Sequence, residues 1–86
     1  MAGYQVALGR VLLAEGDAEG AIGQLRTALA GWREVGAPYE VARARAVLAA
    51  ALRAFHDDEG ADLELQAALD EFRRLGARVD IESTER

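Results

Sequence analysis

The sequence predicts an all-α fold in which four antiparallel helices form two helical hairpins. Three observations predict it. The chain repeats itself at a spacing of 40 residues, as from Leu25 to Leu65, its apolar residues recur at three- and four-residue intervals, and turn-forming residues separate the apolar segments. Pro38 is the only proline and β-branched residues are scarce, so the composition does not favour a sheet.

The repeat aligns small, large, aromatic and turn-forming residues at the same spacing. Because residues of all these kinds recur at the same spacing, we expect two copies of one structural unit. Both lie within a domain of residues 1–77, with repeat 1 over about residues 4–36 and repeat 2 over about residues 38–76. The matching pairs are Leu8 and Leu48, Leu12 and Leu52, Asp17 and Asp57, Gly20 and Gly60, Ala21 and Ala61, Leu25 and Leu65, Ala28 and Ala68, Leu29 and Leu69, and Trp32 and Phe72.

Repeat 1 is expected to hold two helices. The first runs from about Tyr4 to Glu15 and carries a broad apolar surface. Gly16 suits the left-handed conformation that ends a helix, and Asp17 suits the N-cap of the next one. The second helix then runs to about Val35. Its apolar positions are Ala21, Ile22, Leu25, Ala28, Leu29 and Trp32.

Repeat 2 is expected to follow the same plan. Its first helix runs from about Pro38 to Phe55, because proline is tolerated in the first helical turn. Asp57 or Asp58 caps the last helix, which ends at Gly76. The apolar positions of that helix are Ala61, Leu65, Ala68, Leu69, Phe72 and Leu75. Residues 78–86 are expected to be a polar tail or a truncated capping helix.

Glycines inside the second and fourth helices call for an explanation, because each costs about 1 kcal/mol relative to alanine. Gly20 recurs as Gly60, so we expect a close contact between neighbouring helices at both positions. Gly23 and Gly31 have no counterpart in the second repeat, and no role is assigned to them.

The first half resembles the tetratricopeptide repeat at Leu8-Gly9, Leu12, Gly16-Asp17, Gly20-Ala21-Ile22, Leu25 and Ala28-Leu29. The second half keeps the pattern at Leu48, Leu52, Asp57, Ala61, Leu65 and Ala68-Leu69. It departs at Ala49 and His56, where the family prefers glycine. Both halves lack the family's closing proline, and their period exceeds the usual length of about 34 residues. The resemblance implies a short right-handed α-solenoid.

Residues 32–40 and 42–45 resemble a longer bacterial form of this repeat. That form occurs in the helical arms of MalT-like, LuxR-type transcription regulators and beside some cyclases. The resemblance implies a fragment of a larger bacterial regulatory or signalling protein. The chain itself carries no sequence typical of the DNA-binding or ATPase parts of such regulators.

The resemblance also implies which residues touch one another and which face a partner. Residues expected to pack the repeats are Leu8, Gly9, Leu12, Ala21, Leu25, Ala28, Trp32, Leu48, Leu52, Ala61, Leu65, Ala68 and Phe72. Trp32 and Phe72 are interpreted as wedges between helices and not as a ligand cage. The concave face, on which the family binds peptides or partner helices, would contain Val6, Arg10, Leu13, Ala14, Arg43, Ala46, Ala50, Arg53 and Ala54.

The arginines of this face admit two interpretations. Arg10, Arg43 and Arg53 could bind the carboxylates of an acidic partner through bidentate hydrogen bonds. Alternatively, they are ordinary solvated residues that balance the 15 acidic residues of the chain.

Composition argues against several other functions. A net charge of −5 does not suit direct nucleic-acid binding. There is no cysteine, and no apolar run approaches the roughly 18 residues of a membrane span. The absence of a signal peptide favours the cytoplasm. These observations leave a cytoplasmic protein-binding module as the expected class.

Nothing in the sequence predicts an enzyme or a cofactor. No nucleophile has a positioned base, since Ser83 and Thr84 lie in the polar tail. No phosphate-binding loop or dinucleotide fingerprint is present. His56 and the acidic residues 57–59 are interpreted as a helix cap, because consecutive residues at a helix start point in different directions and suit a metal poorly.

Two hairpins are few for a solenoid, which usually needs about three repeats or polar caps. Either Leu8, Val11 and Leu12 at one end or Leu65, Leu69 and Phe72 at the other are expected to lack a neighbour. We therefore expect a homodimer or higher oligomer. Alternatives to partner binding are a purely structural, self-associating element and, less favoured, a segment that senses a small effector.

Overall fold

The computed structural model describes the backbone of residues 2–76 and the side chains of residues 6–76. Its helices are α1 (Ala2–Ala14), α2 (Ala18–Glu34), α3 (Pro38–Ala54) and α4 (Asp58–Leu75), and no strand occurs among the described residues. The predicted all-helical fold with four helices is confirmed. The first helix begins at Ala2 and not at Tyr4. The expected tail at residues 78–86 lies outside the described residues.

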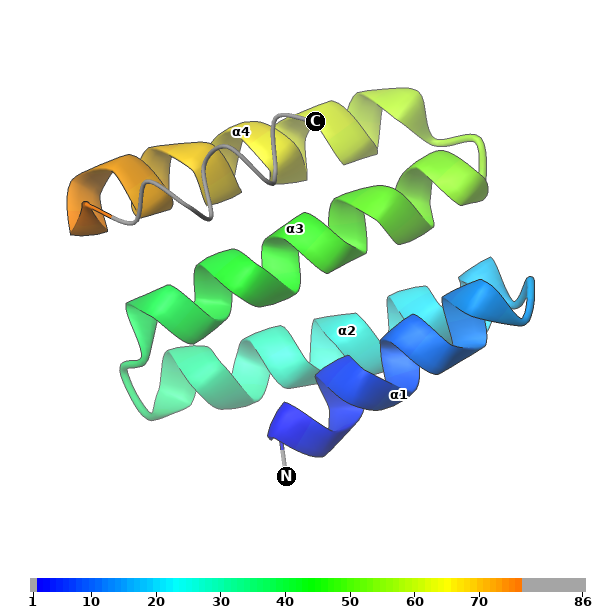
Figure 1. The fold of residues 1–86 in the computed structure, drawn as a ribbon, viewed down its shortest axis with the longest axis horizontal. Helices are drawn as coiled ribbons and strands as arrows, with labels where there is room; N and C mark the ends of the chain where they lie inside the picture. Colours follow the sequence, from blue (N-terminus) through cyan, green and yellow to red (C-terminus); the bar gives the residue numbers. More distant parts are fainter. Residues whose placement is uncertain (1, 77–86) are drawn as a thin grey trace.

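Each helix runs antiparallel to the one before it, so α1 and α3 point in one direction and α2 and α4 in the other (Figure 1). The most extensive packing joins α1 to α2, α2 to α3 and α3 to α4, while α1 touches α3 over a smaller area. The molecule measures 32 × 27 × 19 Å. None of the four described helices is long and apolar enough to cross a membrane.

The turns between α1 and α2 and between α3 and α4 have the same local structure. Gly16 has a φ of 85°, and His56, at the equivalent repeat position, has a φ of 66°. The Asp17 Oδ1 then accepts a hydrogen bond from the backbone N–H of Gly20, and the Asp57 Oδ1 accepts one from Gly60. Asp17 and Asp57 are thus confirmed as N-caps, while Asp58 is the first residue of α4.

The expected contact between neighbouring helices at Gly20 and Gly60 is wrong. A Cβ at either position would lie 2.4 Å from the carboxylate of the capping aspartate, Asp17 or Asp57. These glycines therefore make room for the cap of their own helix. The close approach between helices occurs at Gly9, where a Cβ would lie 2.9 Å from the Cγ of Leu25.

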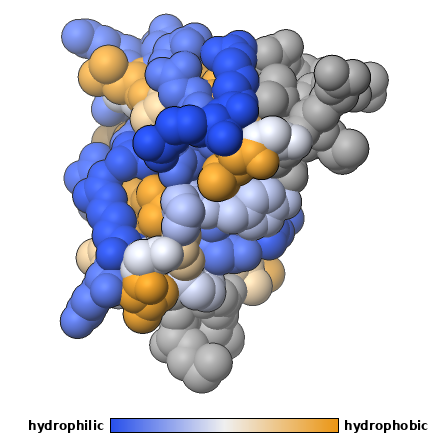
Figure 2. Space-filling view, turned by 90° about the vertical axis from the view of Figure 1, so that its left-hand side faces the viewer, coloured by the Kyte–Doolittle hydropathy of each residue, from blue (hydrophilic) through white to orange (hydrophobic). Residues whose placement is uncertain are grey.

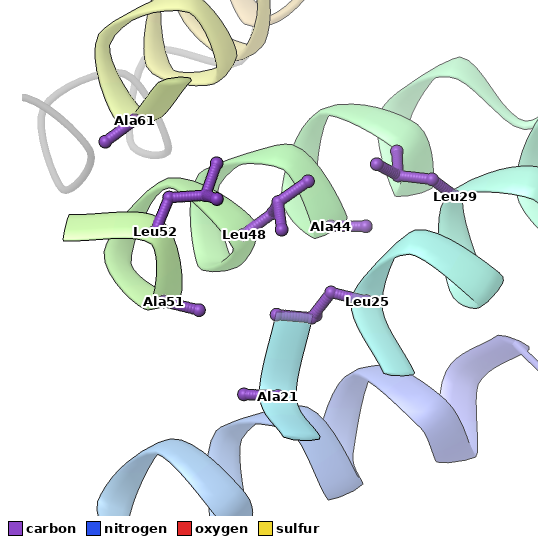
Figure 3. Packing of buried hydrophobic residues seen from close by; sticks show 8 residues of the cluster. All are labelled: Ala21, Leu25, Leu29, Ala44, Leu48, Ala51, Leu52 and Ala61. Carbon is purple, nitrogen blue, oxygen red and sulfur yellow. The ribbon is translucent and has the colours of Figure 1, made fainter. Parts of the chain in front are cut away.

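The main core lies where α2 meets α3, and α4 closes it at one end. Figure 3 shows Leu25 and Leu29 of α2 facing Ala44 and Leu48 of α3, with short alanine side chains between the larger leucines. Because alanine has only a Cβ, the two helix backbones can approach closely. The remaining buried members of the cluster are Ala21, Ala51, Leu52 and Ala61.

A second, smaller cluster joins α3 to α4. Phe72 is buried against Ala42 and Ala68, and its ring contacts the Tyr39 ring edge-on, with centroids 5.9 Å apart. Leu69 is also buried. The expectation that Leu69 and Phe72 lack neighbours is therefore wrong. Leu65 is half-buried.

The other end of the fold has a less covered apolar face. Val11 of α1 is 52% exposed, whereas Ala51, at the equivalent position of α3, is fully buried in the interface with α2. Leu8 is half-buried, whereas its equivalent Leu48 is buried. Because α2 covers this side of α3 and no described helix covers the same side of α1, the face of α1 around Val11 lacks a neighbour, as expected. The same expectation is wrong for Leu12, which is half-buried and packs against the main core.

The end of the molecule at the left of Figure 1 contains the α2–α3 turn and the last turn of α4. Val35 and Leu75 belong to these segments, Tyr39 follows the turn as the second residue of α3, and all three are exposed. Seen end-on, the hydrophobic areas drawn in colour are small and are separated by hydrophilic ones (Figure 2). The coloured part of this end therefore presents no continuous apolar surface.

Candidate partner-binding groove

A groove of about 440 Å³ lies between α1, α3 and α4. From α1 it is lined by Arg10 and Leu13, and from α4 by Leu65 and Phe72. The rest of its lining comes from α3: Arg43, Ala46, Val47, Ala49, Ala50 and Arg53. Arginines therefore stand beside an apolar floor.

A second cavity of about 170 Å³ adjoins the groove. Val6 and Ala7 of α1 line it together with Glu40 of α3. Arg10 and Arg43 line both cavities and so stand where the two meet.

The structure brings together the partner-facing residues that the sequence predicted. Six of them line the groove, and Val6 lines the adjoining cavity; the six are Arg10, Leu13, Arg43, Ala46, Ala50 and Arg53. Ala14 and Ala54 line neither cavity. What these residues bind stays a prediction.

Sequence reasoning missed part of the lining. Val47 lies one helical turn after Arg43, so its spacing alone could have placed it on the same face of α3. Leu65 and Phe72 were assigned only to packing between repeats, yet both also line the groove from α4. Ala49 was not assigned to the groove either.

The helical period explains why α3 supplies most of the groove. Arg43, Val47, Ala50 and Arg53 follow one another at spacings of three or four residues, which places them along one face of the helix. Ala46, Ala49 and Ala50 contribute only methyl groups to that face. The lining between Arg43 and Arg53 therefore consists of shorter side chains, and the two longer arginine side chains stand on either side of it along α3.

The three arginines differ in their ion pairs. The Arg53 Nη2 donates to the Asp62 Oδ1 at 2.8 Å, and both side chains are largely exposed. The Arg43 Nη1 lies 3.7 Å from the Glu40 Oε2. Arg10 is exposed and pairs with none of the described residues. Only Arg10 among the three therefore has a guanidinium without a carboxylate already beside it in the described structure.

The first repeat has two apolar residues at the positions that form the Arg53 ion pair in the second repeat. Arg53 and Asp62 occupy the repeat positions of Leu13 and Ile22, which are both half-buried and packed against the main core. A further pair holds α3 to α4: the Arg45 Nη1 donates to the Glu64 Oε1 at 2.8 Å, and both side chains are about four-fifths buried. The second hairpin thus uses two ion pairs across its helices.

The acidic residues around His56 form a turn and a cap. His56 and residues 57–59 are all exposed, and the Asp57 carboxylate accepts the capping hydrogen bond. Among the described residues, no group of three or more histidine, cysteine, aspartate or glutamate side chains is arranged to hold a metal ion. Ser83 and Thr84 lie outside the described residues.

Comparisons with known proteins add no family assignment. No family model, no curated protein and no solved structure matches the chain. The resemblance to the tetratricopeptide repeat therefore stays a hypothesis.

Proposed function

We propose that the chain is a non-catalytic protein-interaction module that binds an acidic peptide or helix in the groove between α1, α3 and α4. The observation that carries this proposal is the position of Arg10, Arg43 and Arg53 around an apolar floor. A partner segment with both carboxylates and apolar side chains would satisfy both parts of the lining.

Charge and size support an acidic segment as the occupant. The chain has a net charge of −5, yet every charged residue that lines the groove is an arginine. A groove of about 440 Å³ is large enough for a few side chains of a peptide. Guanidinium groups form paired hydrogen bonds with carboxylates, so they would select and orient acidic side chains.

The proposal extends to the fold and to the origin of the chain: two hairpins arranged as a short solenoid, within a larger parent protein. Equivalent caps at Asp17 and Asp57 and the tight contact at Gly9 support a tetratricopeptide-like arrangement of two hairpins. The resemblance at residues 32–40 supports a fragment of a larger bacterial regulatory protein, acting in the cytoplasm.

Charge reversal in the groove tests the proposal. The double variant Arg43→Glu/Arg53→Glu should abolish binding of a fluorescently labelled peptide rich in glutamate and leucine, measured by fluorescence anisotropy. The matched control is Arg26→Glu/Arg33→Glu, which makes the same charge change at exposed positions outside the groove lining. Equal loss in both double variants, with both folded by circular dichroism, would refute binding in the groove.

Self-association is a second candidate function, and the exposure of Val11 favours it. Ala51, at the equivalent position of α3, is buried against α2. The face of α1 that contains Val11 therefore corresponds to a face that a neighbouring helix covers in the second repeat. A second copy that packs its own α1 there would form a two-fold dimer.

Light scattering tests the dimer. Val11→Asp should convert a dimer to a monomer, because it places a charge in the contact. The control Leu63→Asp changes a residue that is 70% exposed on α4, and it should leave the dimer intact. A monomeric mass for the unaltered chain at high micromolar concentration would contradict self-association.

A further inference from the structure

We propose that Arg10 is the principal carboxylate anchor of the groove and that Asp62 is an internal competitor for Arg53. This inference rests on the proposed function, because it concerns how an acidic segment is held in the same groove. It predicts unequal contributions from arginines that the sequence alone treats as alike.

Among the three arginines, Arg10 is the one that can bind a ligand carboxylate without breaking an ion pair of the described structure. Its side chain is exposed, it lines both cavities, and it pairs with no described carboxylate. A carboxylate that reaches Arg10 forms charge-assisted hydrogen bonds without breaking an ion pair of the described structure. Arg43 lines both cavities with it, so at this end of the groove two guanidinium groups stand against the single carboxylate of Glu40 and would attract an acidic group.

Arg53 is in the opposite situation. Its Nη2 already donates to the Asp62 Oδ1 at 2.8 Å, so a ligand carboxylate must share or displace that partner. Both side chains are more than half exposed, and exposed ion pairs are weak. The pair can therefore open, but its opening subtracts from whatever Arg53 contributes to binding.

The fold of the second hairpin does not depend on the Arg53–Asp62 pair. The same two repeat positions hold Leu13 and Ile22 in the first hairpin, so the first copy of the unit forms without an ion pair there. In the second hairpin, the more buried pair of Arg45 and Glu64 already joins α3 to α4. Removing the Asp62 charge should therefore change binding more than folding.

The positions of the arginines and of the apolar floor also predict how the bound segment is oriented in the groove. The acidic residues of the segment would lie at Arg10 and Arg43, where the two cavities meet. Its apolar side chains would lie on the floor formed by Leu13, Val47 and Leu65.

A set of charge-neutralising variants tests the inference with a labelled peptide rich in glutamate and leucine, and with an analogue that has glutamine in place of glutamate. Arg10→Gln should weaken binding of the glutamate peptide about tenfold, as expected for the loss of a hydrogen bond between charged groups. Asp62→Asn should tighten binding about twofold at low salt, and added salt should remove the gain. Arg53→Gln should weaken binding less than Arg10→Gln does, and its effect should be larger in the Asp62→Asn background.

The matched control is Asp70→Asn. Asp70 is also an exposed aspartate of α4, it lies 3.5 Å from Arg73, and it does not line the groove. Asp70→Asn changes the net charge by the same amount as Asp62→Asn. Because it leaves the groove lining and the Arg53–Asp62 pair intact, affinity should be unchanged. Equal tightening by both variants would show a general effect of charge and would overturn the role of Asp62.

The remaining outcomes separate this inference from the proposed function. If the glutamate peptide binds but Arg53→Gln costs as much as Arg10→Gln, the ranking of the arginines is wrong while the groove still binds acidic segments. If the glutamate peptide binds no better than its glutamine analogue to any variant, the proposed function fails and this inference fails with it.

Discussion

Asp17 and Asp57 cap their helices with the same geometry, although they lie in different repeats. Their backbone φ and ψ angles are −97° and 73° for Asp17 and −98° and 74° for Asp57. The hydrogen bonds that their Oδ1 atoms accept measure 2.9 Å from the Gly20 nitrogen and 3.0 Å from the Gly60 nitrogen. The two hairpins are therefore closed by one local structure that the chain uses twice.

Loss of either cap should have nearly the same effect on stability. Asp17→Ala and Asp57→Ala should each lower the free energy of unfolding by about 1 kcal/mol, because a backbone N–H at the helix start loses its partner. Urea denaturation followed by circular dichroism measures the change. Asp58→Ala is the control, since Asp58 makes no capping hydrogen bond. If Asp58→Ala costs as much as Asp57→Ala, the cap does not contribute as described.

His56 should be less favourable at its position than glycine. Its φ of 66° lies in the left-handed region, which disfavours residues with a Cβ, and the equivalent residue of the first repeat is Gly16. His56→Gly should therefore raise the free energy of unfolding by about 0.5 kcal/mol. Thermal unfolding measures the shift.

Replacing glycine at the equivalent position of the first repeat provides the comparison for His56→Gly. Gly16→Ala introduces a Cβ where φ is 85°, so it should lower the melting temperature. A lower melting temperature for His56→Gly would mean that the histidine side chain contributes more than its backbone strain costs.

Gly9→Ala should destabilise the fold by overpacking. The new Cβ would lie 2.9 Å from the Cγ of Leu25, whose side chain is fully buried. We expect a net loss of about 1–2 kcal/mol, within the usual range for extra atoms in a well-packed core. Urea denaturation measures it.

Gly23→Ala is the matched control for Gly9→Ala. A Cβ at position 23 meets no atom within 4 Å, and the position lies in the interior of α2. This substitution should raise the free energy of unfolding by about 1 kcal/mol through helix propensity alone. A similar gain from Gly9→Ala would contradict the close contact between α1 and α2.

The two ion pairs between α3 and α4 should differ in strength. Arg45 and Glu64 are each 21% exposed, whereas Arg53 and Asp62 are 52% and 70% exposed. Water screens the second pair more, so its coupling should be at most about 0.5 kcal/mol. For the first pair we expect about 1 kcal/mol or more.

Double-mutant cycles measure both couplings. The first combines Arg45→Met with Glu64→Gln, and the second combines Arg53→Met with Asp62→Asn. A coupling for Arg53 and Asp62 as large as that for Arg45 and Glu64 would contradict the ranking. It would also mean that a ligand must overcome a stronger Arg53–Asp62 pair than the exposure of the two side chains predicts.

The sequence alone determined the features that depend on neighbouring residues. Helix periodicity, the cap at Asp17 and the end of α4 at Gly76 all act within a few residues, so local chemistry decides them. For α4 the sequence left Asp57 and Asp58 both open as the cap. The resemblance to the tetratricopeptide repeat likewise implied that Arg43, Ala50 and Arg53 share one face. These predictions needed no knowledge of how the helices pack.

The tertiary structure decided which surfaces meet. The spacing of 40 residues showed that Gly20 and Gly60 are equivalent, but only coordinates showed that each accommodates its own cap and that Gly9 makes the close helix contact. Likewise, Phe72 was recognised as apolar, yet its place beneath the groove depends on how α4 packs on α3. The pairing of Arg53 with Asp62 has the same origin, because side chains on different helices meet only where the packing of whole helices brings them together.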